Sequence, residues 1–297
     1  MNKFILFLLI PLIFTQCTEE KAPEIKVMTW NIWHGGLHGT RADGYPKDST
    51  NTIQTTKVIQ EANPDILFMQ ETYCCGMESA KKADFQYSVR ASPNLSIHSK
   101  YPIVEEIKMF RPFNSHAAII DFNGKKLLCV NVWLHWRPDY FSNLDSLTVD
   151  SLVAGEYTTR FAELKEITTI VDSLQAQYKM PVIMGGDFNS GSHLDWIEST
   201  KDKHQNMVVE WPTSKLMESK GYTDTYREVN PDPTNDLAIT WGYEAVWKVQ
   251  DRIDFIYYRG DGLKTETSRI VKEDPEGGFF NSDHHAVLSV ISLGTSK

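Results

Sequence analysis

Polar residues that could bind a cation or move a proton follow several of the most apolar segments of this sequence. They are Asn31, Glu71, Asp187 with Asn189, Asp254, and Asp283 with His284. Carboxylate and amide oxygens are the usual ligands of hard divalent cations such as Mg²⁺ and Mn²⁺. An imidazole beside a carboxylate can donate or accept a proton near neutral pH. Taken singly, each would be an ordinary turn residue, because Asn and Asp are common where a strand ends.

This combination of residue types suits the hydrolysis of a phosphate ester. A phosphodiester is already anionic, so an attacking water needs a cation to neutralise the phosphoryl oxygens and a base to take its proton. Carboxylates can hold the cation, and an imidazole can assist the proton transfer. The sequence has no Cys and His cluster with the spacing of a zinc site. Mg²⁺, with Mn²⁺ as the alternative, is therefore the expected cofactor.

Short runs rich in β-branched and aromatic residues predict the buried strands that position these side chains. The runs are 25–29, 66–69, 117–122, 126–132, 181–184, 253–258 and 286–291. Most of the polar residues stand at or next to the end of such a run, where a rigid sheet can bring several of them within reach of one ion.

Two segments have the apolar spacing of a helix that packs one face against a core. The first covers about 53–62 and stops at Asn63-Pro64, and the second covers about 159–178. A strand, a helix and a strand at the start, with hairpin-like strand pairs in the middle, indicate an α/β protein with mixed sheets. The sequence has no repeat and no long linker, so we expect one domain, ordered from about residue 24.

The motifs around these residues, in this order along the chain, resemble those of the endonuclease/exonuclease/phosphatase (DNase I-like) family. They are Thr29-Trp30-Asn31-Ile32-Trp33, Gln70-Glu71-Thr72, Ser99-Lys100-Tyr101-Pro102-Ile103, Gly186-Asp187-Phe188-Asn189, Asp251-Arg252-Ile253-Asp254 and Ser282-Asp283-His284-His285. Agreement over several ordered motifs is far more specific than any one motif. The resemblance implies a four-layered α/β sandwich, in which two mixed β-sheets are flanked by helices, with an active site where strand-end loops converge.

The same resemblance implies a role for each matching residue. Glu71 resembles the principal carboxylate ligand of the metal ion, with Asn31 and Asp283 beside it.

Asp187 resembles the residue that orients or deprotonates the attacking water, and Asn189 resembles a donor to the phosphoryl oxygens. Asp254 and His284 resemble a pair in which the carboxylate fixes the imidazole, and His284 contacts the phosphate as acid or as base.

The segment Asn131-Val132-Trp133-Leu134 departs from the family pattern, because Trp133 stands where many members have a second histidine. His135 lies two residues further on, which is the same strand face but ~6–7 Å along the strand. A local backbone shift would bring His135 into the site as a catalytic residue, and without that shift it is a surface histidine.

The N-terminus has the outline of a bacterial export signal. Lys3 precedes an apolar run, 4–14, which ends near Cys17 and is followed by acidic residues. An eleven-residue run is too short to cross a ~30 Å bilayer core. We therefore expect a lipoprotein signal peptide over residues 1–17, a lipid anchor on Cys17 and a domain over 18–297. The expected location is the cell envelope, at the outer membrane or the cell surface.

The three remaining cysteines are too few for a disulfide framework in a chain of this length. Adjacent cysteines bond only with a distorted backbone, so we expect Cys74 and Cys75 to be unbonded loop residues, or one of them to pair elsewhere. Arg160, which begins the second predicted helix, could contact phosphate, but an arginine at a helix start is more often solvated.

The net charge is −9, and it becomes −10 when residues 1–17 with Lys3 are removed. The longest basic runs are pairs such as Lys81-Lys82, so a long polyanion finds no basic stripe. We therefore expect a monomeric hydrolase of small-molecule or lipid-linked phosphodiesters. An extracellular endonuclease and a non-catalytic binding lipoprotein are the alternatives. Several aromatic rings could stack on substrate or belong to the core: Trp211, Tyr222, Tyr226, Trp241, Tyr243 and Trp247.

Overall fold

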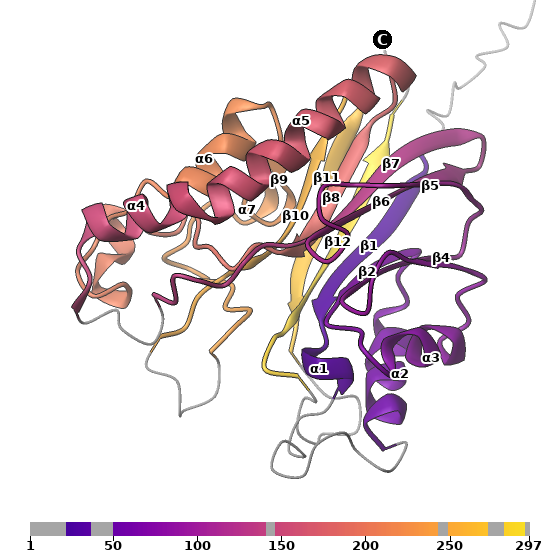
Figure 1. The fold of residues 1–297 in the computed structure, drawn as a ribbon, viewed down its shortest axis with the longest axis horizontal. Helices are drawn as coiled ribbons and strands as arrows, with labels where there is room; N and C mark the ends of the chain where they lie inside the picture. Colours follow the sequence, from indigo (N-terminus) through magenta and orange to yellow (C-terminus); the bar gives the residue numbers. More distant parts are fainter. Residues whose placement is uncertain (1–21, 37–49, 141–145, 243–248, 273–281, 295–297) are drawn as a thin grey trace, which may run out of the picture.

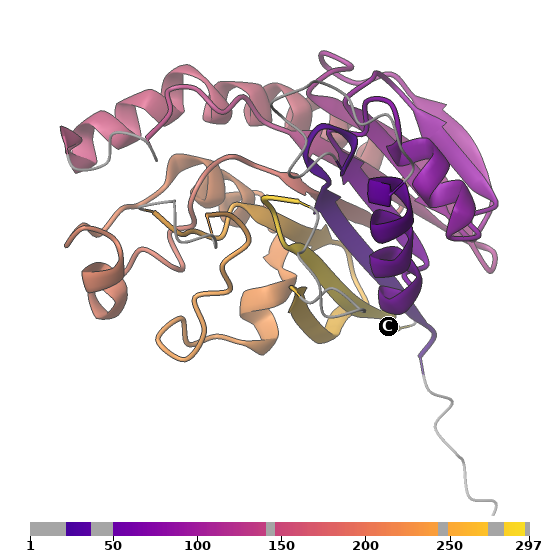
Figure 2. The ribbon, with the colours of Figure 1, turned by 90° about the horizontal axis from the view of Figure 1, so that it is seen from below.

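Two six-stranded sheets lie face to face between helices in the computed structural model (Figures 1 and 2). The structure describes residues 22–36, 50–140, 146–242, 249–272 and 282–294. The expected signal peptide and Cys17 lie outside these residues.

The first sheet contains both ends of the described chain. Its strands, in order across the sheet, are β11 (Leu263–Val271), β12 (Ala286–Leu293), β1 (Glu24–Asn31), β2 (Ile66–Gln70), β4 (Leu95–Ser99) and β3 (Tyr87–Arg90). β1 and β2 are parallel, and the other neighbours are antiparallel.

The second sheet is built from the middle of the chain. Its strands, in order, are β5 (Ile103–Ile107), β6 (Ser115–Phe122), β7 (Lys125–Trp133), β8 (Val182–Asp187), β10 (Asp254–Arg259) and β9 (Thr223–Asp224). β7 and β8 are parallel and the other neighbours are antiparallel, so this sheet is mixed like the first.

Alternation along each strand divides its side chains between two cores. On β7, Leu127 and Cys129 face the other sheet, while Leu128 and Val130 face a helix. The space between the sheets is filled from both sides by Val27, Ile66, Phe68, Ile120, Ile183, Ile256 and Val287.

The outer faces of the sheets are covered by helices on opposite sides of the molecule (Figures 1 and 2). The helices α2 (Thr50–Ala62) and α3 (Gly76–Lys82) pack on the first sheet, and α5 (Arg160–Tyr178) and α6 (Pro212–Ser219) pack on the second. The short helices are α1 (Trp33–Gly36), α4 (Val149–Thr158) and α7 (Thr225–Val229), and Glu198–Lys203 form a 3₁₀ helix. The predicted four-layered α/β sandwich is confirmed. None of the described helices is long and apolar enough to cross a bilayer.

The sequence pattern missed five strands for an identifiable reason. β3 and β5 are short edge strands whose side chains mostly face water, and polar residues interrupt their apolar ones. β4 is buried but contains Ser96, His98 and Ser99, which interrupt any apolar run. β9 has two residues, and β11 alternates with exposed polar side chains. Pairing with neighbouring strands, rather than local composition, places these segments in the sheets.

Two expectations about single residues were wrong. Cys74 and Cys75 are joined by a disulfide bond. The two cysteines directly follow a sharp turn between β2 and α3, in which Glu71 and Tyr73 have positive φ angles. Arg160 is only 1% exposed, because its guanidinium group lies beside Glu156 and donates to two carbonyl oxygens.

Candidate active site

The polar site lies where the inter-sheet faces of both sheets end. In the second sheet, Asp187 at the end of β8 pairs in register with Trp133 of β7 and with Asp254 of β10. Side chains of paired residues point to the same face, which here is the face that packs against the first sheet. β1 and β2 end opposite them with Asn31 and with Gln70, which directly precedes Glu71.

Two glycines let the backbone approach closely at this point. A side chain on Gly185 would collide with Phe68 of the first sheet, its Cβ lying 2.6 Å from Cδ2. A Cβ on Gly186, which has φ +155°, would lie 2.0 Å from the carbonyl oxygen of Val132. Gly185 and Gly186 therefore let β8 lie close to β2 of the first sheet and to β7 of its own sheet. This close packing fixes the position of Asp187, the next residue.

Asn31 joins the two acidic residues that come from different sheets. Its Nδ2 donates to Oδ2 of Asp187 over 3.0 Å and to Oε1 of Glu71 over 3.3 Å, and its Oδ1 accepts from the backbone N–H of Trp33 over 2.9 Å. Asp187 is 1% exposed and Asn31 is equally buried. Glu71, Asn31 and Asp187 are thus brought together as the sequence predicts.

His284 is held between two buried carboxylates. Its Nδ1 lies 2.8 Å from Oδ2 of Asp254, and its Nε2 lies 3.9 Å from Oδ2 of Asp187. Burial disfavours the charged imidazole, but the charges of Asp254, Asp187 and Asp283 outweigh that cost and raise the pKa of His284 to about 10. Burial raises the pKa of Asp187 to about 8, the positive charge of His284 opposes this shift, and the charge of Asp254 adds to it.

Asp283 lies beside the same group. Its Oδ2 accepts from Nε1 of Trp241 over 3.3 Å, while its Oδ1 is buried and has no hydrogen-bond donor among the described residues. Burial raises the pKa of Asp283 to about 6, which the charge of His284 opposes and that of Glu71 increases. An acceptor atom left without a donor beside a second carboxylate is an arrangement that a cation stabilises.

Two neighbouring sets of residues could hold a metal ion. Among the described residues, Asp187, Asp254 and His284 bring three possible ligand atoms within 4.8 Å of one another. The hydrogen bond to Asp254 occupies Nδ1 of His284, however, and a protonated imidazole repels a cation. The sequence-predicted ligands Glu71, Asn31 and Asp283 supply only oxygen atoms, which suits Mg²⁺ or Mn²⁺ better.

Asn189 forms hydrogen bonds with Asp187 through both its backbone and its side chain. Its backbone N–H donates to Oδ1 of Asp187 over 2.8 Å, and its φ angle of 49° bends the chain to allow this. Its Nδ2 donates to Oδ2 of Asp187 over 3.1 Å and to the carbonyl oxygen of Leu134 over 2.9 Å. Asn189 therefore orients Asp187, and both of its amide hydrogens have acceptors in this structure.

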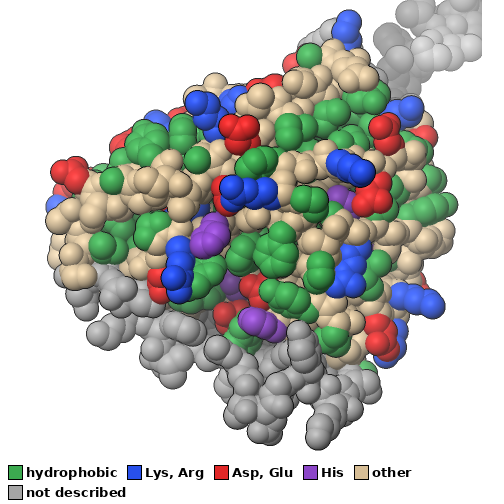
Figure 3. Space-filling view, in the orientation of Figure 1, with side chains coloured by type: hydrophobic (Ala, Val, Ile, Leu, Met, Phe, Trp, Pro, Cys, Tyr) green, Lys and Arg blue, Asp and Glu red, His purple; other side chains and the backbone are tan. Residues whose placement is uncertain are grey.

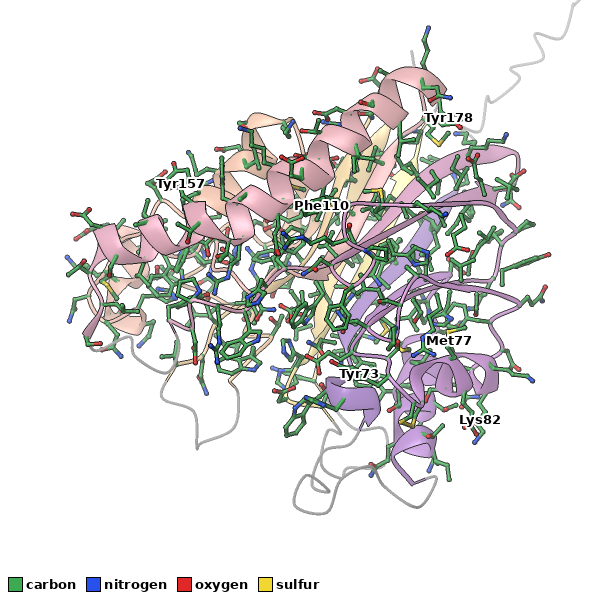
Figure 4. The ribbon with its side chains drawn as sticks, viewed as in Figure 1. Tyr73, Met77, Lys82, Phe110, Tyr157 and Tyr178 are labelled. Carbon is green, nitrogen blue, oxygen red and sulfur yellow. A yellow bond between two sulfur atoms is a disulfide. The ribbon has the colours of Figure 1, made fainter. Side chains whose placement is uncertain are left out.

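His135 does not join the cluster in any of its contacts. Its backbone N–H donates to Glu163 of α5, and its Nδ1 accepts from the backbone N–H of Arg137. It lines a separate cavity of about 460 Å³ beside Arg111, Glu163 and Phe110, the last of which is labelled below α5 in Figure 4. Trp133, which stands where the resemblance expects a second histidine, pairs in register with Asp187.

Several residues that support the site carried no signal in the sequence. Asn94 Oδ1 accepts from the backbone N–H of Glu71, and Thr240 Oγ1 accepts from that of Asp254. Ser282 Oγ accepts from the backbone N–H of His284 and donates to the carbonyl oxygen of Asn31. Apart from the local bond between Ser282 and His284, these contacts join segments that are distant in the sequence, so local patterns cannot reveal them.

A buried polar layer lies directly beneath the site. Gln70 Nε2 donates to Oδ1 of Asn131 over 2.7 Å and to Oγ1 of Thr29 over 3.0 Å. Asn131 Nδ2 donates to backbone carbonyls of Met69 and Ser96, so this layer ties the two sheets together. Such a network holds the strand ends in one arrangement.

His34 contacts the expected metal ligand Glu71. Its backbone N–H donates to Oε2 of Glu71 over 3.0 Å, and its Nε2 lies 3.6 Å from the same atom. The His34 ring stacks on Tyr73, labelled beside α1 in Figure 4, with centroids 5.3 Å apart. His285, which follows His284, donates its backbone N–H to the carbonyl oxygen of Thr240 and contacts the carbonyl oxygen of Ile239 through its ring.

Three of the six aromatic rings singled out in the sequence belong to the core. Trp211, Tyr222 and Tyr226 are buried. Trp241 contacts Asp283 through its indole N–H, so it lies at the site. Tyr243 and Trp247 are outside the described residues.

Comparison with known proteins agrees with this geometry. The model of the Endonuclease/Exonuclease/phosphatase family matches residues 28–284. A Caenorhabditis elegans protein, "Uncharacterized protein F14F9.5", is 28% identical over 264 residues, which cover 80% of this chain and 79% of that protein.

Solved structures share the fold at low sequence identity. Truncated TDP2 from C. elegans superposes with a TM-score of 0.60 at 18% identity, covering 91% of this chain and 97% of that one. TDP2 from D. rerio, complexed with a single strand DNA product, superposes with a TM-score of 0.58 at 15% identity. The match covers 91% of this chain and 99% of that one. The match to the family model spans most of the chain and includes every residue of the site, so the chain belongs to the endonuclease/exonuclease/phosphatase family.

Proposed function

We propose that this member of a family of phosphoric ester hydrolases is a Mg²⁺- or Mn²⁺-dependent phosphodiesterase that acts on small or lipid-linked substrates. The observation that carries the proposal is the single cluster in which Asn31 bridges Glu71 and Asp187 while His284 faces Asp187. A non-catalytic scaffold has no use for so many buried carboxylates, which cost stability unless a ligand or a reaction requires them.

Glu71, Asp283 and the Oδ1 atom of Asn31 would hold the metal ion. When bound, the ion would neutralise charge on the phosphoryl oxygens and favour attack at phosphorus. The Oδ1 atom of Asp283 has no hydrogen-bond donor in the described part of the chain and is available for this purpose, and Glu71 is held in place by the backbone N–H of His34.

Asp187 is suited to take the proton of the attacking water. Burial makes its carboxylate a stronger base than an exposed one, and Asn189 and Asn31 fix its two oxygens. His284, kept charged by Asp254, would donate a hydrogen bond from Nε2 to a phosphoryl oxygen and stabilise the charge that develops there.

The charge of the chain supports small or lipid-linked substrates over long duplexes. The net charge is −9, and on the face drawn in Figure 3 the described Lys and Arg side chains are scattered among acidic and apolar ones. An extracellular nuclease is the second candidate, because D. rerio TDP2, which shares the fold, was solved with a single strand DNA product.

We also propose that the protein is a bacterial lipoprotein anchored through Cys17 at the cell envelope. The apolar run 4–14 followed by Cys17 supports this, since removal of the run leaves an acylated cysteine as the anchor.

The test is a panel of hydrolysis assays on the purified protein with bis-p-nitrophenyl phosphate, p-nitrophenyl phosphate, sphingomyelin and plasmid DNA. Each is measured after EDTA treatment and after addition of Mg²⁺ or Mn²⁺, with Glu71→Gln as the variant expected to need more metal. Full activity after exhaustive EDTA treatment would contradict metal dependence. A kcat/KM on duplex DNA far above that on every smaller diester would establish the nuclease instead.

A further inference from the structure

A second cavity lies next to the phosphate site and has no part in the mechanism above. Its volume is about 600 Å³, and its walls come from the segment after β7 and from the start of α4 and α5. The residues that define its character are Trp136, Arg137, Pro138, Tyr140, Leu152 and Arg160. Cavities of 300–1,000 Å³ with apolar walls and a few polar groups are typical of small-molecule sites.

A backbone hydrogen bond and an electrostatic interaction link the segment that forms this cavity with Asp187. The segment that forms its wall leaves β7 at Leu134, whose backbone N–H donates to the carbonyl oxygen of Asp187 over 2.9 Å. Tyr140 lies near enough for electrostatic interaction: burial raises its pKa, and the charge of Asp187 is among those that add to the shift. A substrate whose phosphate lies at Asp187 can therefore extend toward this cavity.

Arg160 ties the wall of the cavity to the loop that follows Asp187. One of its terminal nitrogens lies 3.2 Å from Oε1 of Glu156, and the other donates to the carbonyl oxygens of Trp136 and Pro138. Glu156 in turn accepts from the hydroxyl of Ser190, the residue after Asn189. Arg160 and Glu156 thus connect the wall of the cavity to the loop that contains Asn189 and Ser190.

The chemistry of the walls favours a flat ring over a lipid chain. Trp136 is 41% exposed, and the guanidinium group of Arg137 lies 4.5 Å from its ring centroid. The Nε atom of Arg160 is buried and has no hydrogen-bond acceptor among the described residues. An acyl chain would cover these charged groups without pairing them, which is costly, whereas a heterocycle offers a stacking face and acceptor atoms.

We propose that this cavity binds the nucleobase of a small nucleotide phosphodiester whose phosphate occupies the site at Asp187. The inference rests on the proposed function and narrows its substrate class from small or lipid-linked diesters to nucleotide-type ones. Trp136 provides the ring contact, and Arg160 provides a buried donor for an acceptor on the base.

The proposal is tested by isothermal titration calorimetry, which does not depend on turnover. Adenosine 5′-monophosphate, ribose 5-phosphate and decyl phosphate are titrated into the protein in the presence of Mg²⁺. We expect the nucleotide to bind at least about tenfold more tightly than ribose 5-phosphate, because the two differ only in the base. Trp136→Ala should reduce that ratio to about one and leave the affinity for ribose 5-phosphate within about twofold.

Tyr157→Ala is the matched control, because Tyr157 is an exposed aromatic residue of α4 that does not line the cavity (Figure 4). Equal affinities for the nucleotide and ribose 5-phosphate in the wild type would overturn the proposal. Tighter binding of decyl phosphate, lost in Trp136→Ala, would overturn it in favour of a lipid chain. If no phosphodiester is hydrolysed with any metal while the nucleotide still binds through Trp136, the proposed function fails and the binding site stands.

Discussion

The Nε2 atom of His284 and the Oδ2 atom of Asp187 face each other across 3.9 Å in the buried centre of the site. Each charge is costly there by itself, and each lowers the cost of the other. Because the separation exceeds hydrogen-bond length, the two groups do not hydrogen-bond to each other. Both therefore remain available to bind substrate. Changing either residue should therefore slow catalysis, whereas the effect on stability should differ between the two residues.

Replacing Asp187 with Asn should lower kcat by on the order of 10²-fold or more, because the amide cannot take a proton from water. The melting temperature should stay unchanged or rise, since a buried carboxylate that burial disfavours has been removed. Steady-state kinetics and thermal unfolding of the same preparation check both parts. Wild-type turnover in this variant would remove Asp187 from the mechanism.

Replacing His284 with Ala should lower kcat by a comparable factor and should also lower the melting temperature. The variant leaves the carboxylate of Asp254 buried without its imidazole partner, and its Oδ1 atom already lacks a hydrogen-bond partner among the described residues. Asp254→Asn in the same chain should recover part of the lost stability but none of the activity. If the single variant is as stable as the wild type, Asp254 does not depend on His284.

Asp251 should make the protein less stable as the pH rises. Burial, followed by the charge of Asp195, raises the pKa of Asp251 from 3.8 to about 8. The folded state therefore keeps a proton that the unfolded chain releases, and the free energy of unfolding falls between about pH 4 and pH 8. Urea unfolding should show that the free energy of unfolding changes less between pH 5 and pH 8 in Asp251→Asn than in the wild type. Other buried acids are present in both proteins, so an equal difference would assign the effect to them.

His135→Ala should leave kcat within about threefold of the wild type, because its contacts are with Glu163 and Arg137 rather than with the cluster. The comparison to make is with Trp133→Ala, since Trp133 lies beside Asp187 in the sheet and should slow turnover more. A tenfold or larger loss in His135→Ala would show that this histidine reaches the substrate in the working enzyme.

Cys17→Ser should release the protein from membranes or block its maturation, because acylation of Cys17 is the proposed anchor. Fractionation of cells that express the wild type and the variant, followed by detection of the protein in soluble and membrane fractions, provides the check. Equal membrane retention of both would rule out the anchor.

The strand and helix patterns of the sequence predict an α/β protein with mixed sheets, and the family resemblance adds the four-layered sandwich and the candidate site residues. Asp187 and Asp254 each adjoin a buried apolar run, and their pairing in register follows once β8 and β10 are neighbours. The helix at 159–178 matches α5, since its apolar face has regular spacing. These are cases in which local pattern and tertiary packing agree.

Where the sequence fails, the deciding contact is distant. The burial of Arg160 depends on Glu156 and on carbonyl oxygens of residues 136 and 138, which no helix pattern reveals. The contact of His34 with Glu71 depends on how α1 packs beside the end of β2. The cavity at Trp136 exists only because α4 packs against the segment after β7. In each case spatial neighbours decide the environment of the residue, and its own type leaves several environments open.

The bond between Cys74 and Cys75 keeps two soft donors out of a neighbourhood built for hard ones. Free thiolates three and four residues after Glu71 would attract Zn²⁺ or Cu⁺, ions that prefer sulfur. Joined as a disulfide, the sulfurs carry no thiolate charge and compete poorly for such ions. In an oxidising compartment the disulfide would therefore leave no thiolate ligand beside Glu71. Cations that prefer sulfur would gain little from binding there, whereas cations that prefer oxygen could still bind the carboxylate.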